Sequence, residues 1–173
     1  MPDQSRDIAI ALMGSPLGGA PAQASQPQAH ELVITRLFAA PRELVFEAWT
    51  DPGHLGKWWG PKPFPGAHIG MEARVGAPWR NSLRSVESGA LLWHQGVFRE
   101  VVPPERLVFT FRWEEEGERG IETLVTLTFA EEDGKTRMTL RQAPFLSSAE
   151  RDGHNEGWSS AFDRLQEFLD KDG

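Results

Sequence analysis

The sequence predicts an α+β domain, with one strand, two short helices, a run of strands and a long final helix. Between residues 107 and 140, apolar and polar side chains alternate along three successive segments, which is typical of an antiparallel sheet covered on one face. From residue 147 onwards, apolar residues recur at helical spacing along one side. That side can cover the apolar face of the sheet.

The composition excludes several classes of protein. No cysteine is present among the 173 residues, which rules out disulfides, cysteine-ligated zinc and thiol chemistry, and we expect a cytoplasmic protein. A net charge of -7 argues against a nucleic-acid-binding surface. No apolar run approaches the roughly 20 residues of a membrane-spanning helix, so no membrane insertion is expected. The chain has 7 Trp and 10 Phe but no Tyr, and therefore no phenol for proton transfer.

Residues 1–30 differ in composition from the rest of the chain. The segment Ser15–Gln28 consists mostly of Pro, Gly, Ala, Gln and Ser, so we predict a flexible tail over 1–30 and one domain over 31–171. A secretory signal is the alternative, since Ile8–Met13 is apolar and Ala22–Ala24 resembles a cleavage site. The apolar run is short for a signal and follows acidic residues, which favours the tail.

Residues 31–61 predict the first strand and the two short helices. The apolar segment 31–38 predicts the strand. A proline then suits the first turn of a helix, in which apolar residues recur at helical spacing over 44–49. Asp51 can cap a second helix that begins at Pro52, and Gly60-Pro61 ends it.

The middle of the chain predicts a series of strands. We expect short strands near 67–74 and 77–85, and longer ones over 91–102, 107–113, 123–130 and 135–142. In the strand 107–113, Val108, Thr110 and Arg112 are expected on a solvent-facing side. Arg99 and Glu100 are adjacent, so one must point inward or lie at a β-bulge. The acidic run 114–118 predicts a solvated hairpin tip.

The last element is predicted to be a one-sided helix. Ser147 and Glu150 have the spacing of a capping box. The apolar side comprises His154, Trp158, Ala161, Phe162, Leu165, Phe168 and Leu169. Gly153 and Gly157 lie inside this helix, where each is either tolerated at a cost of about 1 kcal/mol or makes room beneath the helix.

Three ordered blocks of sequence resemble one known family. The block APRELVFEAWTDPGHLGKWWGP (40–61) is followed by GVFREVVPPERLVFTFRW (96–113) and ETLVTLTF (122–129). Together they resemble the Hsp-ninety ATPase activator homologue-like family of the START-like, or SRPBCC, superfamily. The resemblance implies a helix-grip fold, in which a curved antiparallel sheet grips the C-terminal helix and leaves a cavity between them. The family name also implies a link to the stress response.

The candidate site is a set of large apolar side chains that should converge between sheet and helix. A closely packed core is one interpretation, and an apolar cavity with a few polar groups, as in small-molecule sites, is the other. The resemblance favours the cavity. The residues predicted to bind a ligand are Trp59, Phe64, Trp79, Trp93, Phe98, Phe109, Phe111, Trp113, Met138, Leu140, His154, Trp158 and Phe162.

No residue is predicted to be catalytic, and no metal or cofactor is expected. The five histidines show no metal-site spacing, and no nucleophile motif or phosphate-binding glycine loop occurs. His94 follows Trp93 in a strand, and His154 lies one turn before Trp158. Each is either a packing residue or an inward imidazole that orients a ligand or moves a proton.

Three functions remain open. The favoured one is binding of a hydrophobic or amphipathic small molecule between the sheet and the C-terminal helix. The second is a polyketide cyclase/dehydrase-like enzyme, which the lack of Tyr and of an acid/base pair weakens. The third is a chaperone ATPase-activator-like interaction module, weakened because an N-terminal binding domain is not expected in this chain. A homodimer or a chaperone complex is left open.

Overall fold

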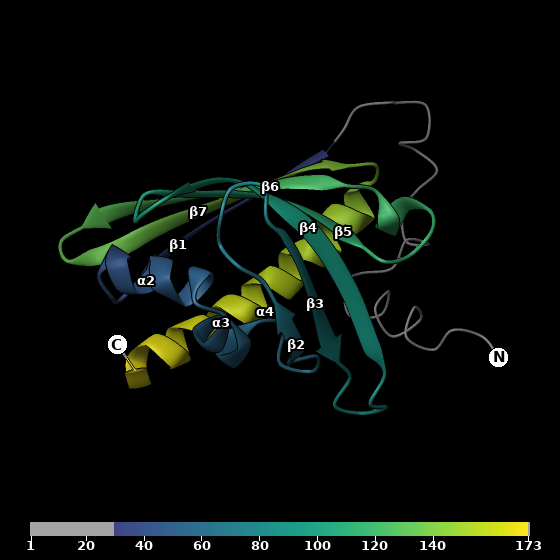
Figure 1. Ribbon diagram of the computed structural model, residues 1–173, viewed down its shortest axis with the longest axis horizontal. Coiled ribbons are helices and arrows are strands. Elements are labelled where there is room, and N and C mark those ends of the chain that lie inside the picture. The colour runs from purple at the N-terminus through teal and green to yellow at the C-terminus, as the bar shows by residue number, and fades with distance from the viewer. Residues whose placement is uncertain (1–29, 173) are drawn as a thin grey trace.

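The computed structural model describes residues 30–172, so the predicted tail and the alternative signal lie almost wholly outside the described residues. The described part is the predicted α+β helix-grip fold (Figure 1). Seven antiparallel strands form one sheet in the order β1-β7-β6-β5-β4-β3-β2. The elements are β1 (His30–Phe38), α2 (Arg42–Thr50), α3 (Pro52–Trp58), β2 (Gly66–Gly70), β3 (Pro78–Arg84), β4 (Leu91–Val102), β5 (Arg106–Trp113), the 3-10 helix η2 (Glu118–Gly120), β6 (Thr123–Glu132), β7 (Lys135–Phe145) and α4 (Ser148–Asp172).

The two short helices form as predicted. The backbone N–H of His54 donates to the Asp51 carboxylate at 3.1 Å, which makes Asp51 the N-cap of α3, and Pro52 occupies the first helical position. After α3 the chain turns sharply at Gly60, whose φ is +87°. A Cβ there would lie 2.3 Å from the Phe64 carbonyl oxygen, so only glycine fits. This turn places Trp59 and Pro61 beside α4.

The strands follow the predicted pattern, with one difference in detail. Of the two alternatives for Arg99 and Glu100, the β-bulge is the one observed, because the β4–β5 register shifts between Phe98 and Glu100. The second strand ends at Gly70, earlier than predicted. The Gly70 N–H donates to the Asn81 side chain at 3.1 Å, and the chain then turns at Arg74–Ala77.

The prediction of a solvent-facing side on β5 was wrong for two of its three residues. Val108 and Thr110 are buried on the outer side of the sheet. The Thr110 hydroxyl accepts the backbone N–H of Val97 from β4 at 2.8 Å, which explains why a polar side chain is buried there.

The prediction of a fully solvated acidic tip was also wrong in part. Glu114 accepts two hydrogen bonds from Arg80, at 2.6 and 2.8 Å, and Glu115 accepts one from the buried Arg119 at 2.7 Å. Glu116 and Glu118 are exposed, as predicted. The tip therefore folds back over the sheet instead of projecting into solvent.

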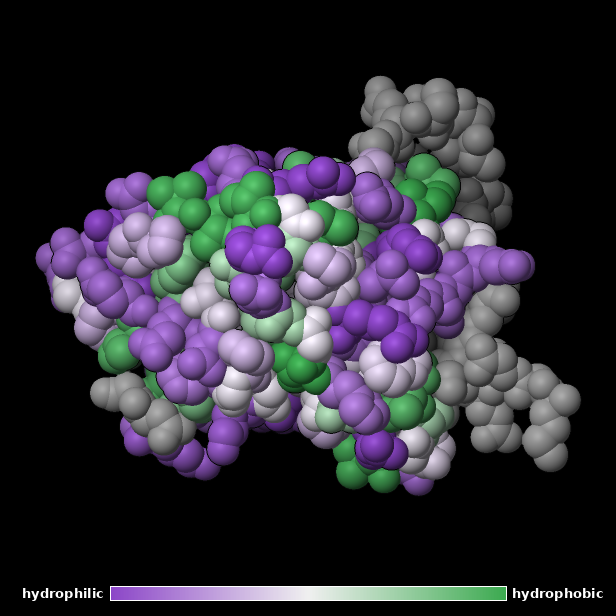
Figure 2. All heavy atoms as spheres, in the orientation of Figure 1, coloured by the Kyte–Doolittle hydropathy of each residue, from purple (hydrophilic) through white to green (hydrophobic). Residues whose placement is uncertain are grey.

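Helix α4 crosses the concave side of the sheet (Figure 1). The Glu150 N–H donates to the Ser147 hydroxyl at 3.1 Å, as the capping pattern predicts. Phe162 and Leu165 are fully buried, and the ring of Phe162 meets that of Phe38 edge to face at 6.1 Å. On the face shown in Figure 2, small groups of hydrophobic side chains alternate with hydrophilic ones. Within residues 30–172, no helix has the length and apolar character needed to span a membrane.

Candidate functional site

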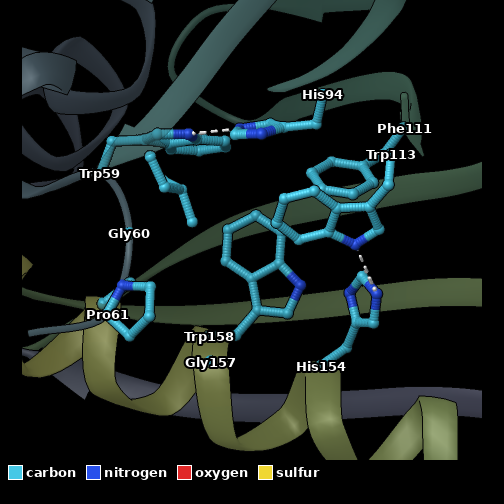
Figure 3. A pocket seen from close by; sticks show the side chains of 11 residues that line it. Trp59, Gly60, Pro61, His94, Phe111, Trp113, His154, Gly157 and Trp158 are labelled. Carbon is cyan, nitrogen blue, oxygen red and sulfur yellow. Dashed lines mark hydrogen bonds between the residues drawn. The ribbon is translucent and has the colours of Figure 1, made fainter. Parts of the chain in front are cut away.

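A small cavity lies between the sheet and α4, beside the turn that follows α3 (Figure 3). Its volume is about 30 Å³, which is room for one or two water-sized groups, and it is partly open to solvent. Nearly all of its wall is apolar. The lining residues are Trp59, Gly60, Pro61, Leu83, His94, Phe111, Trp113, His154, Gly157, Trp158 and Ala161.

Two indole–imidazole hydrogen bonds frame the cavity (Figure 3). The Trp59 Nε1–H donates to His94 Nε2 at 2.8 Å, and the Trp113 Nε1–H donates to His154 Nε2 at 3.2 Å. An indole nitrogen can only donate, so each imidazole must accept at Nε2. Both neutral histidines therefore carry their proton on Nδ1. The residues of the two pairs come from the turn after α3, from β4, from β5 and from α4, so the pairs join four of the segments that line the cavity.

Both histidines are uncharged at neutral pH. Burial lowers the pKa of His94 to about 3, and the Leu92 carbonyl and Glu114 oppose that shift without reversing it. Burial also lowers the pKa of His154 to about 3, and the positive charge of Arg119 adds to the effect. His94 Nδ1 is buried and has no hydrogen-bond partner among the described residues, so its interaction with the Leu92 carbonyl is not a hydrogen bond of normal geometry. Neither side chain can supply an imidazolium to a substrate at pH 7.

A chain of hydrogen bonds fixes Trp158 at the side of the cavity. Its Nε1–H donates to the Gln142 amide oxygen at 2.8 Å, and the Gln142 amide nitrogen donates to the Thr123 hydroxyl at 2.9 Å. That hydroxyl donates to the Phe111 carbonyl at 3.0 Å. All of these groups are buried, so the indole is held in one orientation.

Beyond Trp113 and His154 lies a second, more polar hollow of about 10 Å³. Phe111, Trp113 and His154 line both hollows, while Arg119 and Glu150 line only the second. The Arg119 guanidinium lies over the Trp113 ring, 4.8 Å from its centroid. Burial raises the pKa of Glu150, and the positive charge of Arg119 opposes this shift. The polar hollow thus adjoins the apolar cavity, and Phe111, Trp113 and His154 form the wall between them.

The structure brings only part of the predicted set to the cavity. Trp59, Phe111, Trp113, His154 and Trp158 line it, and Trp79, Phe98 and Phe109 line an adjoining hollow of about 20 Å³. Four others are buried in the packed core, outside the walls of the hollows described above: Phe64, Met138, Leu140 and Phe162.

Trp93 lies on the opposite face of the sheet from the cavity. Successive side chains of a strand point to opposite faces, and its neighbours Leu92 and His94 both point inward. Trp93 is stacked on His68, with ring centroids 5.1 Å apart, and Arg80 lies 3.9 Å above its ring. It cannot contact a ligand held between sheet and helix.

Sequence reasoning missed several residues of the site. Gly60, Pro61 and Leu83 line the cavity through the turn after α3 and through β3, and no periodic pattern marks them. Arg119 was not considered as a site residue, although it is only 9% exposed. Its isolated position after four glutamates was the available signal, because a single cation amid carboxylates is suited to a buried ion pair.

One group of side chains outside the cavity has the composition of a metal site. Ligand atoms of Glu47, Asp51 and His54 lie within 4.8 Å of one another at the α2–α3 corner. Asp51 already accepts the His54 N–H as an N-cap, and Glu47 is exposed. The group is explained by the helix corner and requires no ion.

Comparison with known proteins agrees with this architecture. A profile of the family described as Activator of Hsp90 ATPase homolog 1-like protein matches residues 39–170. Among curated proteins, no sequence matches the chain.

Several solved structures are similar to the chain over most of its length. A protein from Chromobacterium violaceum has a TM-score of 0.75 and 26% identity, covering 80% of this chain and 96% of that one. The AHSA1 protein from Silicibacter pomeroyi has a TM-score of 0.74 and 27% identity, covering 83% and 100%. A protein from Rhizobium leguminosarum has a TM-score of 0.69 and 27% identity, covering 84% and 97%.

Proposed function

This chain belongs to the Activator of Hsp90 ATPase homolog 1-like family, and we propose that it binds an apolar or amphipathic small molecule between its sheet and helix α4. The observation that carries the proposal is the cavity whose wall is aromatic and whose two histidines are both neutral. An apolar wall with a few convergent polar groups is the usual composition of a small-molecule site.

The chemistry of the wall favours binding over catalysis. A general acid or base works best with a pKa near the operating pH, and a histidine with a pKa of about 3 is neither a proton donor nor a strong base at pH 7. The Nε2 lone pairs are already occupied by Trp59 and Trp113. The histidines are therefore suited to orienting the surrounding rings and to lining the site.

The size of the cavity restricts how a ligand enters. A volume of about 30 Å³ is smaller than an aromatic ring, so a ligand must displace part of the wall. The smallest side chains of the wall are at Gly60, Gly157 and Ala161. Gly157 also lowers the helix propensity of α4 at this point by roughly 1 kcal/mol. We propose that an apolar ring or chain of the ligand enters between the α3 turn and α4 at these residues.

A fluorescent probe tests this proposal directly. N-phenylnaphthylamine, which is apolar and uncharged, is expected to bind with one-to-one stoichiometry and to raise the unfolding temperature. A ligand selective for the folded state stabilises it by about 2.7 kcal/mol at 100 times its Kd. The variant Ala161→Leu fills the cavity from α4 and is expected to weaken binding at least about tenfold, at a stability cost of about 1–3 kcal/mol.

The matched control is Ala130→Leu, which adds the same side chain at an exposed position of β6. It is expected to leave probe binding unchanged. No saturable binding to the native protein, or equal binding by Ala161→Leu and Ala130→Leu, would contradict the proposal. In that case the outer surface, and not the cavity, would be the place to look for function.

A further inference from the structure

The polar end of the cavity is built around one buried cation. Arg119 is 9% exposed and lies in η2, between the hairpin tip and the first turn of α4. Its Nε donates to Glu115 at 2.7 Å, and its Nη1 donates to Glu150 at 3.5 Å. These two contacts and the Trp113 ring beneath the guanidinium hold the side chain in one position.

One donor group of this guanidinium has no acceptor. Arg119 Nη2 is buried and has no hydrogen-bond partner among the described residues. Buried donors are nearly always paired, so an unpaired charged donor requires an explanation. Arg119 lines the polar hollow, and that hollow shares Phe111, Trp113 and His154 with the apolar cavity. A ligand group that displaces part of this shared wall reaches the hollow that Arg119 lines.

Size and charge decide what kind of group fits beside Nη2. The hollow of about 10 Å³ has room for one atom of the size of oxygen, so a carboxylate or phosphate would displace more of its wall than a carbonyl oxygen does. Glu115, Glu118 and Glu150 surround the one positive charge and would repel an anion. A neutral acceptor oxygen meets neither obstacle.

We propose that Arg119 is the polar anchor of the cavity and that the ligand is an uncharged, mainly apolar molecule whose carbonyl-type oxygen accepts a hydrogen bond from Nη2. This inference rests on the proposed function, because it places the apolar body of the same ligand in the cavity between Trp59 and Trp158. Beyond the proposed function, it specifies the chemical class of the ligand and its orientation, with the carbonyl end towards Arg119. No bond is made or broken in this interaction.

Three probes with the same aromatic body test the inference. They are propionyl-(dimethylamino)naphthalene, which carries a ketone, dimethylaminonaphthalene, which carries no carbonyl, and dimethylaminonaphthoate, which is an anion. The native protein is expected to bind the ketone at least about tenfold more tightly than either of the others, as one hydrogen bond to a charged donor predicts. Hydrogen bonding to its carbonyl should also shift the ketone's emission to longer wavelength than in an apolar solvent.

The variant Arg119→Lys keeps the positive charge between Glu115 and Glu150 but lacks the planar fork that presents Nη2. It is expected to lose the preference for the ketone over dimethylaminonaphthalene and to shift the ketone's emission to shorter wavelength. Arg137→Lys is the matched control, since Arg137 is exposed and paired with Glu132 on the β6–β7 hairpin. This control is expected to leave both properties unchanged. Circular dichroism establishes that each variant is folded.

A second variant keeps the test decisive if Arg119→Lys does not fold. Glu150→Gln removes one of the repelling carboxylates, so the naphthoate is expected to gain affinity relative to the ketone. The inference is overturned if the native protein binds ketone and carbonyl-free probe equally, if it prefers the naphthoate, or if neither variant changes the relative affinities. Binding of dimethylaminonaphthalene in these cases would leave the proposed function standing, whereas no binding of any probe would remove both.

Discussion

Gly96 lies at a point of β4 where the sheet leaves no space for a side chain. A Cβ at this position would lie 1.7 Å from the Thr110 carbonyl oxygen and 2.5 Å from Trp79 Nε1. The Trp79 Nε1–H donates to that same carbonyl at 3.2 Å, across Gly96. The absence of a side chain thus allows an indole from β3 to reach β5 and seal the wall beneath the adjoining hollow.

Gly96→Ala is accordingly expected to destabilise the protein by at least about 2 kcal/mol, since the added methyl must push backbone or the Trp79 ring aside. Urea unfolding measures this loss. Gly56→Ala is the control, because a Cβ there would make an ordinary contact with Ile69 at 3.4 Å and alanine favours the helix. If the two variants unfold at the same urea concentration, the claim that the sheet leaves no space for a side chain at position 96 is wrong.

The two cavity histidines make stability depend on pH. Their folded-state pKa values of about 3 lie below the ordinary value of 6.5, so between these values the unfolded chain binds more protons. Stability therefore falls as pH is lowered from about 6.5 towards 3. Each histidine adds a slope of up to about 1.4 kcal/mol per pH unit.

The double variant His94→Gln/His154→Gln is expected to lose less stability than the native protein between pH 6.5 and pH 5, as measured by urea unfolding at each pH. His54→Gln is the control, since His54 is 40% exposed at the α2–α3 corner. If the free energy of unfolding changes with pH in the same way for the native protein and the double variant, the cavity histidines are not buried in the neutral state.

At the scale of elements, one side chain ties α4 to the end of α3. Arg164 donates to the carbonyls of Trp59 and Gly60 at 2.7 and 2.8 Å, and to that of Lys57 at 3.1 Å. These carbonyls lie at the C-terminal end of α3, where a cation is favoured. Burial lowers the pKa of Arg164, which reflects the cost of bringing this cation into the contact. The contact sets the position of the cavity wall at Trp59, Gly60 and Pro61.

Arg164→Gln is expected to release this wall. Hydrogen exchange of the amides between residues 57 and 62 should become faster, and stability should fall by about 1–3 kcal/mol, because hydrogen bonds to a charged donor are lost. Arg137→Gln, which removes an exposed ion pair, should change neither. Unchanged exchange at 57–62 in Arg164→Gln would mean that α3 holds this wall without help from α4.

The elements themselves were largely predictable from local physics. The Asp51-Pro52 cap, the bulge near Arg99 and the cap at Ser147 each follow from one or two residues, and all three are present. The burial of Thr110 was not predictable from alternation, because its hydroxyl accepts a hydrogen bond from Val97 on a neighbouring strand. The alternation of residues along a strand predicts which face of the sheet a side chain points to, but not which other residues pack on that face.

At the scale of the whole molecule, the sequence predicted which types of residue form the site, and the structure determines which of these residues lie around one cavity. Eight of the predicted residues line the cavity or the adjoining hollow, because inward-pointing positions of β3, β4 and β5 and one side of α4 must face each other. Met138, Leu140 and Phe162 are also fully buried, but they belong to the packed core and do not line the cavity or the hollows beside it. Trp93 was assigned from residue type, although its position next to His94 places it on the other face. Arg119 lines the adjoining polar hollow, where its guanidinium contacts Glu150 across the boundary between η2 and α4.

The domain limits of 31–171 stay a prediction, and the family profile covers residues 39–170. Within the described residues, the central claim is that the space between the sheet and α4 holds a small molecule. Its walls come from elements far apart in the chain, so any ligand there links the α3 turn, the sheet and α4 in the folded protein.

Native mass spectrometry of the freshly purified protein tests this claim most directly. We expect a fraction of the molecules to carry one additional small mass, lost on unfolding and absent from Ala161→Leu purified in parallel. Added N-phenylnaphthylamine should displace that mass and appear at one copy per chain. A spectrum that shows only the mass of the chain, with and without the probe, for both the native protein and Ala161→Leu, would contradict the claim.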